Sequence, residues 1–176
     1  MADFYPYLVA SLPMLQFPMK PPFSSERFLE VCCPLIPEKD CQVLRTLPQP
    51  GDYGENSSRV PVIRQWIEFN VALRNELVKV RAAKRHLEPG PFLRPGGSSG
   101  SFFTPAGVGA QLTASLLDTE KAIDETRWKL LDALATGHYF ELEFLIIYAL
   151  KLRILERWEN IQHANGPVLL AEALQR

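Results

Sequence analysis

Acidic side chains that could do chemistry gather between residues 118 and 132, where five of them occur. They are Asp118, Glu120, Asp124, Glu125 and Asp132. Glu120 and Asp124 are four residues apart, which would place both carboxylates on one helix face, where a pair could serve as general acid and base. No histidine, phosphate-binding loop or set of metal ligands accompanies them in the sequence. We therefore predict that these carboxylates provide surface electrostatics, and we predict no catalytic residue.

Cysteine and histidine residues lack the spacing of a reactive or metal-binding site. Cys32, Cys33 and Cys41 fall close together, but zinc sites generally use four ligands in paired motifs. Their odd number and an expected reducing compartment argue against a disulfide, so we predict small buried side chains. The three histidines are far apart near expected helix ends, and no ligand role is predicted for them: His86, His138 and His163. We predict neither a metal nor a cofactor.

The composition is that of an ordinary globular domain. The chain has 176 residues, of which 47% are hydrophobic and 22% charged, enough to bury a substantial core. Nineteen basic against 20 acidic side chains give a net charge of -1, which argues against a nucleic-acid-binding protein. No apolar run approaches the ~20 residues that span a bilayer. The N-terminus lacks the basic region of a secretory signal, so we expect a cytoplasmic protein.

The helix signals along the chain predict an all-α fold. A proline-rich N-terminal strap over residues 1–23 is expected to be extended, with a short strand over 5–11 as an alternative. Helices are expected over about 24–33, 37–47, 61–86, 112–135 and 139–163, the last at the centre of the core. Seven side chains are expected to be nearly buried: Trp66, Leu73, Leu77, Trp128, Leu145, Leu152 and Leu155.

Glycine, proline and serine concentrate in residues 89–109, which we expect to form a flexible linker between a unit over 1–88 and another over 110–176. Its Gly-Gly-Ser-Ser-Gly run at 96–100 is followed by Ser-Phe, whereas a Walker loop needs Lys-Ser or Lys-Thr. A weak internal repeat aligns residues 72–74 with 149–151. It favours repeated helical units packed as a bundle.

One pair of charged residues interrupts an apolar stripe. Glu120 and Arg127 occupy the gaps between Leu116, Ile123 and Leu130. We predict that the two form an inward polar pair that fixes helix register.

Basic residues dominate the segment 59–86, which holds seven Lys or Arg against two Glu, an excess of +5. Within it, Arg74, Arg81 and Arg85 lie near one line of the expected helix. Two interpretations stay open: a solvated helix face, or a docking strip for an acidic surface of a partner.

Five segments carry a resemblance to a family: 7–13 (YLVASLP), 72–77 (ALRNEL), 80–84 (VRAAK), 120–132 (EKAIDETRWKLLD) and 148–158 (YALKLRILERW). Together they resemble an uncharacterised bacterial family associated with V-type ATPase gene clusters. That family is distantly similar to the C-type central-stalk component of V/A-type ATPases, whose eukaryotic counterpart is the d-type component. Central-stalk proteins of this type generally have three helical units, and this chain has at most two.

The resemblance implies a non-catalytic structural or coupling protein. Its partners would be other V-type ATPase subunits, in the rotor ring or the central shaft, and it would reach the membrane only through that complex. A generic helical adaptor unrelated to rotary ATPases is the first alternative. An enzyme or nucleotide binder that uses the acidic helix or the glycine-rich linker is the second.

Overall fold

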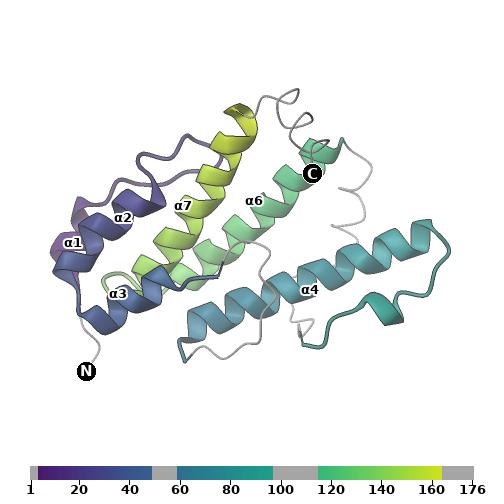
Figure 1. Ribbon diagram of the computed structural model, residues 1–176, viewed down its shortest axis with the longest axis horizontal. Coiled ribbons are helices and arrows are strands. Elements are labelled where there is room, and N and C mark those ends of the chain that lie inside the picture. The colour runs from purple at the N-terminus through teal and green to yellow at the C-terminus, as the bar shows by residue number, and fades with distance from the viewer. Residues whose placement is uncertain (1–3, 49–58, 97–114, 164–176) are drawn as a thin grey trace, which may run out of the picture.

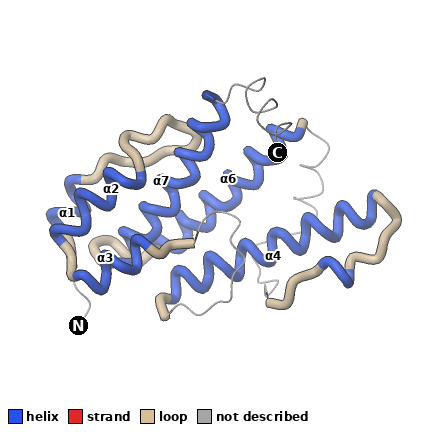
Figure 2. The backbone as a smooth tube through the Cα atoms, viewed as in Figure 1, coloured by secondary structure: helices blue, strands red, loops and turns tan. Residues whose placement is uncertain are grey.

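The computed structural model describes residues 4–48, 59–96 and 115–163, and every regular element within these ranges is a helix (Figure 2). The α-helices are α1 (Pro6–Ser11), α2 (Ser25–Cys32), α3 (Glu38–Arg45), α4 (Pro61–Lys84), α6 (Leu116–Ala135) and α7 (Leu142–His163). Two short 3-10 helices are η1 (Cys33–Leu35) and η2 (Gly90–Phe92). The predicted all-α fold is confirmed.

Helix α7 is the centre of the packing, as predicted. It contacts α2, α3, α4 and α6, and its residues 145–150 are all buried. Figure 1 shows α6 and α7 side by side, with α2 on the other side of α7. In this view α4 lies below α6. Within the described ranges, no helix combines the length and the hydrophobicity that a bilayer-spanning segment requires.

Local sequence signals explain where the long helices begin and end. Ser24 caps α2 by accepting a hydrogen bond from the Arg27 amide at 3.1 Å, and Ser115 caps α6 in the same way through Asp118. Pro61 is the first residue of α4, as expected for a residue whose φ is already helical. After α6, Gly137 adopts a φ of 93°, which favours glycine and ends the helix. The predicted start of this helix at 112 lies outside the described residues.

The N-terminal segment contains the helix α1, so both the extended conformation and the alternative strand over residues 5–11 are wrong for this part of the expected strap. Pro6 takes the first helical position of α1, and Leu8 on the same turn is buried. The Tyr5 hydroxyl donates to the Asp40 carboxylate of α3 at 2.6 Å. Further along, the Phe17 ring packs against the rings of Trp128 and Trp158. The segment is therefore fixed to α3, α6 and α7.

The hydrophobic core contains six of the seven side chains that were expected to be buried. The exception is Leu77, which is half-buried. It lies in the C-terminal half of α4, which extends away from α7 in Figure 1. Described residues from both sides of the expected linker belong to one hydrophobic cluster. The division into two units and the internal repeat stay predictions.

The first part of the expected linker, residues 89–96, has defined structure. It contains η2, and the Asn75 side chain on α4 both accepts from the Arg94 amide and donates to the Arg94 carbonyl, each at 3.0 Å. These two bonds hold the returning chain against α4. Residues 97–109, including the rest of the glycine-rich run, lie outside the described residues.

Two of the three cysteines form a disulfide, which corrects the prediction that all three are free. Cys33 begins η1 and Cys41 lies in α3, and the turn between them brings their Cα atoms to 5.1 Å. That separation is within the range a disulfide requires. The third cysteine, Cys32, is free and fully buried, which confirms the prediction for this residue alone.

We expect the Cys32 thiol to be unreactive in the folded, unreduced protein. Burial raises the pKa of this thiol to about 12, so almost no thiolate is present at pH 8. Incubation with iodoacetamide at pH 8 should leave the native chain unmodified, and addition of denaturant should give one label. Labelling of the native protein at the rate of a free thiol would contradict the burial of Cys32.

Candidate functional site

A buried polar network surrounds Asp124, and it contains three of the residues that the sequence singled out on the acidic helix, namely Glu120, Asp124 and Arg127. We call Asn70, Glu120, Asp124, Arg127, Arg157 and Trp158 the Asp124 network. Asp124 itself is 0% exposed. It accepts from Arg127 Nη1 and Arg157 Nη1, each at 2.6 Å, and from Trp158 Nε1 at 2.9 Å.

The network continues to α4 on one side and toward solvent on the other. Arg127 Nε donates to Asn70 Oδ1 at 2.8 Å, and Asn70 Nδ2 donates to the Trp66 carbonyl at 2.8 Å. At the half-buried end, Arg157 Nη2 donates to Glu120 Oε2 at 2.5 Å. Side chains of α4, α6 and α7 are thereby joined in one chain of hydrogen bonds.

The structure corrects the predicted pairing of Glu120 with Arg127, because each residue pairs with a different partner. Both residues belong to the network, but Arg127 pairs with Asp124, while Glu120 pairs with Arg157 of α7. Asp124, which we expected at the surface, is the buried centre. The reason is that α7 supplies a guanidinium and an indole to the same face of α6, and these partners are distant in sequence.

The charges of the network balance, because two carboxylates face two guanidinium groups. Burial alone would lower the pKa of Arg157, but the hydrogen bonds and charges of Glu120 and Asp124 outweigh it and raise that pKa above its ordinary value. The Asp124 carboxylate is thus held by three hydrogen-bond donors from two helices. The arrangement fits the fixing of helix register better than general acid–base chemistry.

The candidate docking strip on α4 is only partly exposed. Arg81 and Arg85 are exposed, whereas Arg74 is half-buried in the middle of the helix. Arg85 is the residue that follows the last residue of α4. The accessible part of the predicted strip is therefore at the C-terminal end of α4, where Lys84 is also exposed.

A cavity of about 320 Å³ lies between residues 12–15 and helices α6 and α7. Its lining is mostly apolar and includes Phe144 and Ile147. The two polar groups at its wall have partners, since the Tyr148 hydroxyl donates to the Pro13 carbonyl and Lys151 pairs with Asp132. Burial and, secondarily, Cys32 raise the pKa of Tyr148 to about 12. The Tyr148 hydroxyl is therefore poorly suited to act as an acid or a base near neutral pH.

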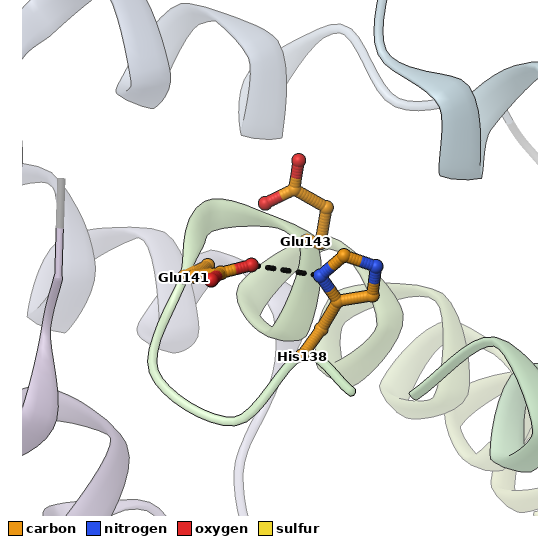
Figure 3. A group of neighbouring side chains, drawn as sticks. All are labelled: His138, Glu141 and Glu143. Atoms are coloured by element: carbon orange, nitrogen blue, oxygen red, sulfur yellow. Dashed lines mark hydrogen bonds and ion pairs between the residues drawn. The ribbon is translucent and has the colours of Figure 1, made fainter. Parts of the chain in front are cut away.

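A second group of polar side chains lies at the turn between α6 and α7, and the sequence analysis missed it. His138, Glu141 and Glu143 come together there, as Figure 3 shows. His138 Nδ1 lies 2.7 Å from Glu141 Oε2. The spacing of one histidine and two glutamates within six residues was the available signal. We call these three residues the turn cluster.

Comparison with known proteins gives one match. Residues 108–175 match a family described as a protein of unknown function (DUF2764). The matched range covers α6, α7 and the turn cluster, and it contains every charged member of the Asp124 network. The match extends over less than half of the chain, and it shows a similarity of this C-terminal part. No curated protein and no solved structure matches the chain.

Proposed function

We propose that this protein is a non-catalytic structural or coupling protein that associates with a V-type rotary ATPase. The observation that carries the proposal is the basic end of α4, where Arg81, Lys84 and Arg85 are exposed in a chain of net charge -1. Charged groups at an interface mainly steer association and select the partner. An acidic surface of another ATPase subunit, in the rotor ring or the central shaft, fits this end of the helix.

Two further observations support the proposal. The segments 120–132 and 148–158, which carry part of the resemblance to the V-type ATPase-associated family, lie in α6 and α7 and in the range that the matching family covers. The Asp124 network joins α4 to these helices through hydrogen bonds between side chains, as suits a protein that connects other subunits. We propose that the protein lies in the cytoplasm and reaches the membrane only through the complex. In that reducing compartment, Cys33 and Cys41 would be held as thiols.

Affinity purification of the tagged full-length chain from its native host tests the proposal. We expect V-type ATPase subunits to co-purify, in amounts that fall as the salt concentration of the wash rises. Recovery of the chain without any ATPase subunit at low salt would contradict the proposal.

A generic helical adaptor is the second candidate, and one observation favours it. The large exposed aromatic side chains include Phe4 and Tyr7 on one segment and Tyr139 and Phe140 on another. The Tyr5 amide donates to the Phe140 carbonyl at 2.6 Å, so these segments meet at one end of the bundle. Exposed apolar patches often mark interaction sites. Reproducible co-purification of one defined partner outside the rotary ATPase would favour this candidate.

Charge reversal at the end of α4 tests the docking surface directly. Because Arg74 is half-buried, the variant combines Arg81→Glu with Arg85→Glu. We expect an intact fold and an association rate with the purified ATPase subcomplex about 10-fold lower at low salt, since steering of this kind is electrostatic. Stopped-flow or surface-based kinetics at two ionic strengths would measure it.

The matched control is Lys121→Glu with Lys129→Glu on α6, which changes the net charge equally at exposed positions. Equal slowing by both double variants would mean that total charge, and not the end of α4, sets the rate.

A further inference from the structure

The turn between α6 and α7 places three potential metal ligands side by side. His138 follows Gly137 in the turn, Glu141 immediately precedes α7, and Glu143 lies in the first turn of that helix. One ligand atom from each of the three lies within 4.8 Å of the others, and all three side chains are half-buried. In Figure 3 the Glu141 carboxylate points at the His138 ring, and Glu143 approaches from the helix.

The backbone around the turn cluster is held in place by hydrogen bonds. The His138 amide donates to the Ala135 carbonyl at 3.1 Å, and the Phe144 amide donates to the Glu141 carbonyl at 3.2 Å. The bond from the Tyr5 amide to the Phe140 carbonyl anchors the middle of the turn. The backbone that carries the three side chains is therefore held in place, which reduces the entropy cost of gathering them around an ion.

The spacing of the ligand atoms suits a small divalent ion. Bonds of about 2.0–2.2 Å in tetrahedral geometry place ligand atoms about 3.3–3.6 Å apart. His138 Nδ1 and Glu141 Oε2 are 2.7 Å apart in a direct hydrogen bond, so an ion would replace this bond and move the two atoms slightly apart. Rotation of the Glu143 side chain would bring in the third ligand atom, which lies within 4.8 Å of the others.

The charge of the cluster also favours a cation. The cluster contains two carboxylates, which attract a cation, and an imidazole, which offers a nitrogen ligand. Among the described residues, no lysine or arginine forms an ion pair with Glu141 or Glu143. The partial positive charge at the N-terminus of α7 offsets part of the negative charge of the two carboxylates. It does not explain why an imidazole lies beside them.

We propose that the turn cluster binds one divalent transition-metal ion, with His138, Glu141 and Glu143 as ligands. An imidazole with two carboxylates suits Zn²⁺ or Co²⁺ better than Mg²⁺ or Ca²⁺, which prefer oxygen ligands alone. Three protein ligands leave a coordination position for water. The site is independent of the proposed association with an ATPase, and it departs from our prediction that the chain binds no metal.

Metal titration of the full-length, unreduced chain tests the proposal, because the disulfide then keeps Cys33 and Cys41 from binding metal. After dialysis against EDTA, calorimetric titration with ZnCl₂ should give one equivalent of binding and a raised melting temperature. Titration with CoCl₂ should give visible absorption of a tetrahedral site without the near-ultraviolet band of a cobalt–thiolate bond. Excess MgCl₂ should not compete.

Three single variants assign the ligands: His138→Asn, Glu141→Gln and Glu143→Gln. Each should weaken zinc binding at least 10-fold while the circular dichroism spectrum stays helical. The control is His163→Asn, because His163 pairs with Glu159 at 3.0 Å on α7 but lies outside any three-ligand group in the described residues. It should bind zinc as the wild type does. Absence of zinc binding by the wild type, or unchanged affinity in both His138→Asn and Glu143→Gln, would overturn the proposal.

Discussion

Replacement of Asp124 by alanine should lower the free energy of unfolding by about 3–5 kcal/mol, the cost typical of removing one partner from a buried ion pair. The carboxylate is fully buried and accepts from Arg127, Arg157 and Trp158. Without it, the Arg127 guanidinium stays buried with Asn70 as its remaining hydrogen-bond partner, and the Trp158 N–H loses its acceptor. Urea denaturation followed by circular dichroism would measure the change.

Asp132 provides the matched control on the same helix. Its carboxylate pairs with Lys151 at 2.5 Å, but the side chain is 56% exposed. An ion pair at such a position is worth about 0–1 kcal/mol, so Asp132→Ala should be nearly neutral. If Asp124→Ala were no more destabilising than Asp132→Ala, Asp124 could not be the buried centre that joins α6 to α7.

Leu152→Ala should have an effect of similar size, about 2–5 kcal/mol, through a different mechanism. The side chain is 0% exposed in the middle of α7, the helix that contacts α2, α3, α4 and α6. Its truncation removes apolar contacts and leaves a cavity that close-packed neighbours fill only in part. The melting temperature and the urea midpoint should both fall.

The control for this change is Leu117→Ala near the start of α6. Leu117 is exposed, and surface substitutions of this kind usually alter stability by less than about 0.5 kcal/mol. An unchanged unfolding midpoint for Leu152→Ala would show that this face of α7 is not in the core.

The sequence by itself determined the helices, because the signals that start and stop a helix act over a few residues. Ser24, Pro61 and Gly137 each act on the backbone within one turn, and the structure places helix ends beside all three. The apolar periodicity of residues 139–163 likewise predicted the central helix, because burial on nearly every side requires apolar residues on nearly every side. The all-α fold and most of the core followed from such local rules.

The first residues of the chain show the limit of these local signals. Residues 5–11 contain too few turns for periodicity to separate helix from strand. Tertiary contacts decide between helix and strand here. Tyr5, immediately before α1, bonds to Asp40 of α3, and residues that follow α1 pack on α6 and α7.

Only the tertiary structure decided which polar residues meet. Asp124 and Arg157 are 33 residues apart, and Asn70 lies 57 residues before Arg127, so no local spacing could pair them. The disulfide depends on how η1 turns α3 back toward α2, and the turn cluster depends on how Gly137 directs the chain into α7. Side-chain chemistry in this protein is set by the packing of helices on one another, whereas the helices themselves are set by residues within a turn of their ends.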